Sequence, residues 1–365
     1  MGELFFELLK CAIWGNTPYI KRPLNEEEWQ QLFSMAKEQT VTGIMLDAIA
    51  KLPQELQPQK QLRMQWIIAQ KIIEKQNAYM NKELADMITE MESAGIKAYL
   101  LKGQGVAAYY PEPSHRVCGD IDLFFKKRDF EKAIEHFISK NCIIEDNSEE
   151  SHAETTYKNI SLELHKKSAT FYSKKTQKLY SQIMEKLLNE RDEYVEINGC
   201  QIPVLPKTAN AIQLLAHTQR HIITSGIGLR QVCDWVLFIY RNQKYIEATE
   251  FIGILKELQL YKTYKALTYI AIEKLGLPRD YAMCNFKKTD IKNARKMMWL
   301  ITTFGNFGHY GEHNILQNKA DYLKAYIWKV RNCIRFYRLA QREAFSYPVW
   351  QLHSVKDTIL KRKHE

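Results

Sequence analysis

The change of hydrophobic period at Gly95 is the sequence feature that most constrains the fold. Over residues 59–94, apolar side chains from Ile68 to Met91 recur at helical spacing, which predicts one long amphipathic helix. Gly95 is a natural end for this helix, because glycine adopts positive φ angles at little cost. After it, the apolar residues fall into short runs that are typical of buried strands and shorter helices. A chain with this pattern must combine long helices with a sheet.

The short runs after Gly95 predict an α/β module that ends in a hairpin. Strands are expected over residues 96–101, 119–125, 142–145, 154–158 and 161–165, with helices over 103–110 and 128–139. Asn198-Gly199 lies between two further apolar runs and favours a type I′ turn, because both residues tolerate positive φ angles.

From Pro206 onward the pattern is again helical, and proline is favoured at a first helical position. Helices are expected over residues 228–241, 245–258, 262–275, 290–302 and 321–345. The glycine-rich residues 305–311 are expected to form a loop, with a mobile lid as the alternative. We therefore predict an α+β fold, with a mixed-sheet core over residues 95–205, an N-terminal helical segment over 1–94 and a C-terminal helical domain over 206–365.

Composition limits the compartment and the partners. Polar residues interrupt every apolar run, and no basic leader precedes an apolar core, so neither a membrane span nor a signal peptide is expected. The seven cysteines form no CxxC pair, which indicates reduced thiols in a cytoplasmic protein. The formal charge of +10 is compatible with a polyanionic partner such as a nucleoside triphosphate or RNA, and equally with a basic, soluble surface.

Two carboxylates lie one residue apart in the run Gly119-Asp120-Ile121-Asp122-Leu123. Because side chains alternate along a strand, Asp120 and Asp122 are expected on one face, with Cα atoms about 6–7 Å apart. Carboxylates at this separation can bind one divalent cation or bracket two, and Mg²⁺ prefers such oxygen ligands. The alternative is a chance Asp-x-Asp on a surface.

Two further elements could complete such a site. The run Leu100-Leu101-Lys102-Gly103 predicts a strand that ends at a helix start, where backbone N–H groups and an ammonium can meet a triphosphate. A plain turn with an exposed lysine is the alternative. Glu163 and His165 share one face of a later predicted strand, which makes Glu163 a candidate third metal-binding acid or simply part of a polar strand face.

Together these residues resemble the polymerase-β superfamily of nucleotidyltransferases, which has a glycine-led helix start, an acid-x-acid strand and a third acid on a later strand. More closely, the runs resemble an uncharacterised bacterial nucleotidyltransferase family with a Leu-Lys-Gly signature. The matching elements are Leu100-Leu101-Lys102-Gly103, Tyr110-Pro111, Arg116, Asp120-Ile121-Asp122-Leu123 and Glu163-Leu164-His165, with weaker matches at His217, His221, Leu229-Arg230 and Asp234.

The resemblance implies a polymerase-β-like core that moves a nucleoside monophosphate from an NTP to an unknown hydroxyl-bearing acceptor. It assigns catalysis and the binding of Mg²⁺ or Mn²⁺ to Asp120, Asp122 and Glu163, with Glu163 or Asp122 taking the hydroxyl proton. Small-molecule, sugar-phosphate, protein and tRNA acceptors all remain open.

The same resemblance assigns phosphate binding to Lys102, Gly103 and Arg116. Here the chain departs from the wider superfamily, because Lys102-Gly103 replaces its usual Gly-Ser or Gly-Gly pair. A non-catalytic nucleotide- or RNA-binding module that retains the fold is therefore the alternative function.

Three features of the helical part allow two interpretations each. His217 and His221 lie one helical turn apart and could bind zinc, or they line a cleft. Arg230 and Asp234 predict a helix-surface ion pair, with a substrate contact as the alternative. The basic, aromatic residues over 321–345 could bind RNA or an acidic protein, or they pack in a core.

Overall fold

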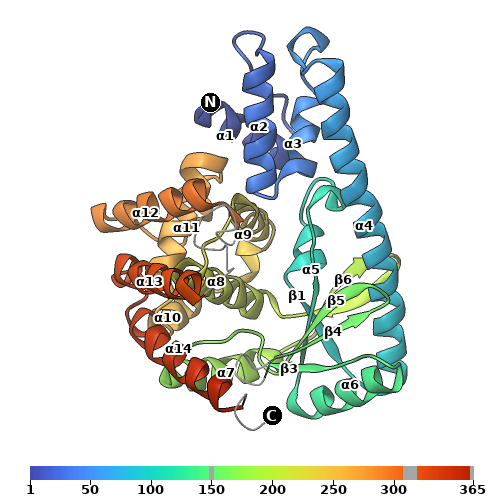
Figure 1. Ribbon diagram of the computed structural model, residues 1–365, viewed down its shortest axis with the longest axis vertical. Coiled ribbons are helices and arrows are strands. Elements are labelled where there is room, and N and C mark those ends of the chain that lie inside the picture. Colours follow the sequence, from blue (N-terminus) through green and yellow to red (C-terminus); the bar gives the residue numbers. More distant parts are fainter. Residues whose placement is uncertain (148–151, 307–318, 362–365) are drawn as a thin grey trace.

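The structure is a computed structural model that describes residues 1–147, 152–306 and 319–361. Four helices open the chain: α1 (Gly2–Trp14), α2 (Glu26–Glu38), α3 (Thr42–Ile49) and α4 (Lys60–Ser93). The long helix predicted over residues 59–94 is confirmed as α4, and Gly95 follows it with a φ of 68°. In Figure 1, α4 runs along one edge of the molecule, from the N-terminal helices down beside the sheet.

The middle of the chain forms the mixed sheet that the sequence predicts. Its elements are β1 (Ala98–Leu101), α5 (Gly103–Ala107), β2 (Ile121–Phe125), α6 (Lys127–Ser139), β3 (Glu145–Asn147), β4 (His152–Tyr157), β5 (Ile160–His165), α7 (Lys174–Leu188), β6 (Glu193–Ile197) and β7 (Cys200–Val204). The strand order is β3-β4-β5-β2-β1-β7-β6. The β2–β5 and β1–β7 pairs are parallel and the others antiparallel, which confirms an α+β fold.

The hairpin predicted at Asn198-Gly199 is confirmed. Strands β6 and β7 pair in an antiparallel register that closes at Ile197 and Cys200. Asn198 and Gly199 have φ angles of 51° and 75°, the positive values that a type I′ turn requires.

The rest of the chain is helical: α8 (Lys207–Thr224), α9 (Leu229–Asn242), α10 (Ala248–Glu257), α11 (Tyr261–Leu275), α12 (Lys288–Phe304), α13 (Lys319–Phe336) and α14 (Gln341–Lys361). Pro206 is the N-cap of α8 and not its first helical residue. The single helix predicted over residues 321–345 is wrong, because the chain turns between α13 and α14. Most of the predicted loop over 305–311 lies outside the described residues.

Two hydrophobic cores hold these parts together. The larger core combines α1 to α3 and the first half of α4 with the C-terminal helices, and the smaller one packs the second half of α4 and α6 against the sheet. Buried hydrogen bonds reinforce the first: the Gln39 side chain donates to the carbonyl of Ile301 at 2.9 Å and accepts from the N–H of Leu229 at 2.9 Å. Helices α1 to α3 and the first half of α4 therefore share one core with the C-terminal helices, although the two parts are far apart in sequence.

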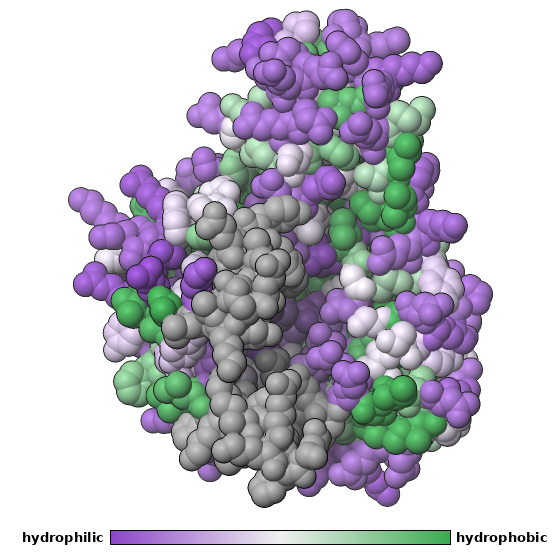
Figure 2. Space-filling view, in the orientation of Figure 1, coloured by the Kyte–Doolittle hydropathy of each residue, from purple (hydrophilic) through white to green (hydrophobic). Residues whose placement is uncertain are grey.

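The surface and the cysteines agree with the composition. Figure 2 shows one face of the molecule as largely hydrophilic, with the hydrophobic side chains in separate small patches. Within the described ranges, no helix combines the length and apolarity that crossing a bilayer requires. All seven cysteines are free thiols, as the irregular spacing predicts.

Candidate active site

A cavity of about 590 Å³ lies between the sheet and helices α8 and α9. One wall comes from the ends of β1, β2 and β5, and it contains Lys102, Asp120, Asp122, Glu163 and His165. The opposite wall comes from α8 and α9, and it contains Gln213, His217, His221 and Arg230. The predicted acids and the predicted lysine thus line one cavity, whose volume is in the range typical of small-molecule sites.

Asp122 and Glu163 lie side by side on neighbouring strands, because the parallel register of β2 and β5 pairs these two residues. The residues that flank Asp122 in β2 point into the core and are completely buried, which turns the Asp122 carboxylate towards the cavity. Sequence alternation predicted the face of each strand. The pairing of the two strands brings the two carboxylates together.

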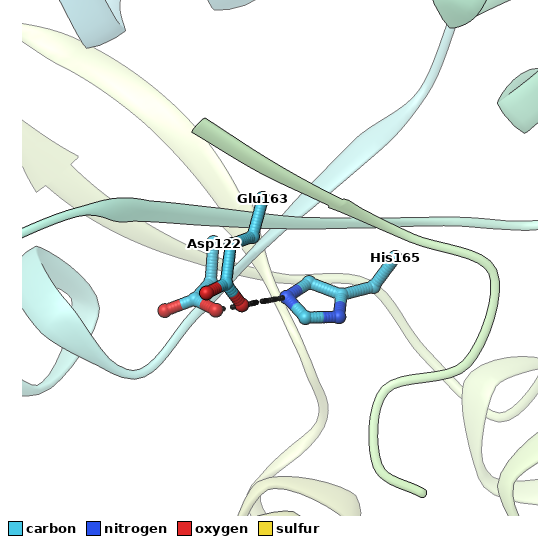
Figure 3. Close-up of side chains that lie close together, drawn as sticks. All are labelled: Asp122, Glu163 and His165. Atoms are coloured by element: carbon cyan, nitrogen blue, oxygen red, sulfur yellow. Dashed lines mark hydrogen bonds and ion pairs between the residues drawn. The ribbon is translucent and has the colours of Figure 1, made fainter. Parts of the chain in front are cut away.

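His165 joins the two carboxylates, as Figure 3 shows. Its Nε2 lies 2.8 Å from Oδ1 of Asp122 and 3.2 Å from Oε2 of Glu163. Burial alone would lower the pKa of His165, but the hydrogen bonds to Asp122 and Glu163 outweigh it and raise that pKa. His165 therefore orients the carboxylates as a proton donor, a role that the sequence analysis did not assign to it.

The ligand atoms of Asp122, Glu163 and His165 all lie within 4.8 Å of one another, a spacing that could hold one metal ion. Two carboxylates with room for substrate oxygens suit Mg²⁺ or Mn²⁺. The predicted zinc alternative at His217 and His221 receives no support from this geometry, since neither belongs to such a group among the described residues.

Asp120 stands just outside β2, whose first residue is Ile121. It is half-buried at the edge of the same cavity. The charge of Asp122 and then burial raise the pKa of Asp120 to about 6, against the opposing charge of Lys102. Its carboxyl group thus lies in the same electrostatic cluster, although it does not share the close contacts between Asp122 and Glu163.

Lys102 faces this cluster from the end of β1. Its ammonium lies 2.9 Å from Oδ1 of Asp122. Burial would lower the pKa of Lys102, but the charges of Asp122, Glu163 and Asp120 raise it. Helix α5, which starts at Gly103, has only five residues, so its dipole adds little to the positive charge of the ammonium.

Arg116 is engaged with protein groups. Its guanidinium binds Asp234 through two parallel contacts, Nε to Oδ1 at 2.8 Å and Nη2 to Oδ2 at 2.7 Å. Nη1 donates to the carbonyl of Val117 and to Sγ of Cys118, both at 3.2 Å. Arg116 can reach a phosphate only by leaving Asp234. The predicted surface ion pair between Arg230 and Asp234 is wrong, because Asp234 is buried and Arg116 binds it.

Arg230 lines this cavity and has spare hydrogen-bonding capacity. Nη1 donates to the carbonyl of Val117 at 2.8 Å, whereas Nε has no partner among the described residues. Burial and then the charge of Arg116 lower the pKa of Arg230, and its own charge acts on Asp120. This arrangement suits an anion, because a cation in a cavity wall without a full set of acceptors gains from an incoming phosphate.

Apart from Arg220, the α8 residues that line the cavity are uncharged. Burial, with the nearby cations Lys102 and Arg220, lowers the pKa values of His217 and His221 well below the ordinary value, so both rings are neutral near pH 7. Gln213 is 1% exposed, and its carbonyl oxygen has no hydrogen-bond partner in the described part of the chain. Since buried polar groups are rarely left unpaired, Gln213 is available to a ligand or a bound water.

The chain was compared with known protein families, curated proteins and solved structures. Residues 25–276 match a family described as uncharacterised nucleotidyltransferase. No curated protein matches the chain. A solved structure, an antigenic nucleotidyltransferase-like protein from Paracoccidioides brasiliensis, is similar at 12% identity and a TM-score of 0.36, over 60% of this chain and 96% of that one. A likeness this distant establishes nothing further.

Proposed function

The chain belongs to the uncharacterised nucleotidyltransferase family, and we propose that it transfers a nucleoside monophosphate from an NTP to a hydroxyl-bearing acceptor with Mg²⁺ or Mn²⁺. The observation that carries this proposal is the pairing of Asp122 with Glu163 at the wall of a cavity. Reduced thiols and an NTP substrate suit action in the cytoplasm.

Asp122 and Glu163 would hold the cation, and Asp120 would contribute a third carboxylate from the same edge of the sheet. When bound, Mg²⁺ or Mn²⁺ supplies neutralisation of the triphosphate charge and activation of the acceptor hydroxyl. His165 fixes the orientation of both carboxylates through its Nε2 proton. The site thus has the oxygen ligands and the orienting donor that such a cation requires.

The cations around the cavity divide the task of binding phosphate. Lys102 and Arg230 face the cavity and can donate to phosphate oxygens, together with the backbone N–H of Gly103. Arg116 acts through Asp234: it ties the segment that precedes Asp120 to helix α9. We assign Arg116 this positioning role in place of a direct phosphate contact.

Proton removal from the acceptor falls to Glu163 in this arrangement. Oδ1 of Asp122 already receives contacts from Lys102 and His165, whereas the Glu163 side chain is 29% exposed and lines the cavity. A general base must be within reach of the hydroxyl, so the more accessible carboxylate is better placed. On α8, Gln213 and the neutral ring of His217 suit an uncharged, hydrogen-bonding part of the acceptor or the nucleotide.

The test uses purified protein, each of the four NTPs with Mg²⁺ or Mn²⁺, and fractions of cell extract as the source of acceptor. We expect metal-dependent NTP binding by calorimetry and release of pyrophosphate. Both should be lost in Asp120→Ala/Asp122→Ala and kept in the matched control Asp86→Ala, because Asp86 is an exposed acid on α4 that pairs with Lys82. NTP binding that the double variant leaves unchanged would contradict the proposal.

The same assay separates the alternative function. A non-catalytic nucleotide- or RNA-binding module would bind its ligand without releasing pyrophosphate, and RNA binding would weaken steeply with salt. That pattern would favour the module over the enzyme.

A further inference from the structure

Oδ1 of Asp122 already has two hydrogen-bonding partners within the protein. The ammonium of Lys102 lies 2.9 Å from Oδ1, and Nε2 of His165 lies 2.8 Å from the same atom. The two side chains of the Lys102–Asp122 pair are only 17% and 3% exposed. A free divalent cation that approaches Oδ1 therefore meets a positive charge in its place.

The backbone shows that this placement of Lys102 is maintained against strain. Lys102 has φ 49° and ψ −140°, backbone angles that residues other than glycine rarely adopt. Such a conformation is strained and is found mainly where the surrounding structure requires it. Glycine would adopt these angles without strain, so the lysine side chain, and not the turn, accounts for the residue at this position.

The charge balance explains why the ammonium stays. Lys102 feels the charges of three acids, Asp122, Glu163 and Asp120. Removing a partner from a buried ion pair leaves an uncompensated charge, which is strongly unfavourable. Lys102 can leave Asp122 only when another anion is offered, and a triphosphate in the same cavity offers several anionic oxygens to its flexible side chain.

We propose that Lys102 is the internal counter-ion of the candidate metal site and makes this site selective for a divalent cation that arrives with a triphosphate. The inference rests on the proposed function, since it assumes that Asp122 and Glu163 hold the cation. In the absence of nucleotide, Lys102 occupies the place of the metal. In its presence, the ammonium moves to the phosphates and frees Asp122. Metal and nucleotide binding are then coupled, and the coupling acts equally in both directions.

The experiment titrates the whole protein with Mn²⁺ alone and follows free Mn²⁺ by electron paramagnetic resonance. The main variant is Lys102→Gly. It removes the ammonium, and it is expected to fold because glycine adopts a positive φ angle without strain. Lys102→Met is the second variant. Lys167→Met is the matched control, because it removes another ammonium from the wall of the same cavity.

We expect both Lys102 variants to bind Mn²⁺ alone about tenfold more tightly than the wild type or more, and the control to leave the affinity unchanged. With a non-hydrolysable NTP present, the wild type should gain more Mn²⁺ affinity than either variant does. Equal Mn²⁺ affinity in wild type and Lys102→Gly would overturn the counter-ion role, and pyrophosphate release by the wild type would still support the proposed function. Absence of Mn²⁺ binding from every form, with and without NTP, would overturn both.

Discussion

Two buried ion pairs line the same cavity and differ in how fully their polar groups are hydrogen-bonded within the protein. Arg116 and Asp234 form two parallel contacts at 2.8 and 2.7 Å, and the hydroxyl of Tyr110 donates to Asp234 at 2.7 Å. Lys102 and Asp122 form a single contact at 2.9 Å from a backbone with a positive φ angle. In the first pair, both carboxylate oxygens of Asp234 have hydrogen-bond donors within the protein. The second leaves a surplus of carboxylates around one ammonium.

The chemistry of the two cations matches these two arrangements. A planar guanidinium fixes a carboxylate through two bonds and so holds two segments in one geometry. An ammonium on a flexible side chain is a point charge that can change partners. These differences fit a positioning role for the Arg116–Asp234 pair and the proposed exchange of the Lys102–Asp122 pair for a ligand.

The comparison predicts that the exchangeable pair controls catalysis. Asp122→Asn keeps the shape of the side chain and removes a metal-binding charge, so we expect pyrophosphate release to fall by about 10³-fold or more. Thermal unfolding serves as the control, because the fold should persist in the absence of ligand. A rate within tenfold of the wild type would show that Asp122 does not bind the metal.

The Arg116–Asp234 pair should control stability. Arg116→Met leaves the buried carboxylate of Asp234 without its partner, and we expect the free energy of unfolding to fall by about 3–5 kcal/mol in urea titrations. Replacing both residues, as Arg116→Met/Asp234→Leu, should recover much of this loss, because the charge is then absent. An Arg116→Met protein as stable as the wild type would contradict the structural role of the Arg116–Asp234 pair.

Arg230 extends the comparison, because its guanidinium also lines the cavity but is not fully hydrogen-bonded. Its Nε has no partner among the described residues. Arg230→Ala should weaken NTP binding by about ten- to a hundredfold, in line with the loss of charged hydrogen bonds to phosphate. Calorimetry with NTP and with the corresponding nucleoside measures this. If the affinity for the nucleoside falls equally, Arg230 does not contact the phosphates.

A third ionic contact adds a smaller, pH-dependent effect. His115 lies 2.8 Å from Asp47 and 3.0 Å from Glu74, and so ties the segment before Arg116 to α3 and α4. Burial would lower the pKa of His115, but the contacts with Asp47 and Glu74, with the nearby charge of Glu112, raise it. The stability that this contact supplies is therefore complete below pH 6.5 and is lost as the pH rises through the raised pKa.

His115→Gln should remove this pH dependence of unfolding, which urea titrations from pH 5 to pH 9 measure. The effect should be smaller than that of Arg116→Met, because these groups are partly exposed and Lys71 shares Glu74. The same pH profile in variant and wild type would assign the dependence to other groups.

Features that depend on residues close together in the sequence could be predicted from it. The helical period of α4, the alternation in β5 and the turn at Asn198-Gly199 depend on neighbouring residues, and each was predicted correctly. The strand predicted over residues 119–125 begins only at Ile121, so Asp120 lies outside it. Glu163 and His165 were also placed on one strand face. The break between α13 and α14 was missed, because the apolar and basic pattern continues across it.

Contacts between distant residues were beyond the sequence. Arg116 and Asp234 are 118 residues apart. Periodicity cannot show that Asp234 pairs with this distant residue and not with Arg230 on its own helix. The register that sets Asp122 beside Glu163 is likewise a property of the folded sheet. The unusual backbone at Lys102 had one local sign, a lysine where the wider superfamily has glycine, but its direction towards Asp122 required the structure.

A crystal structure with Mn²⁺ and a non-hydrolysable NTP, with anomalous density recorded for manganese, tests the central claim most directly. We expect a manganese peak between carboxylate oxygens of Asp122 and Glu163, at about 2.1 Å from each, with Lys102 turned from Asp122 to the triphosphate. A nucleotide bound in this cavity with no manganese between the two carboxylates, and with Lys102 still on Asp122, would contradict it.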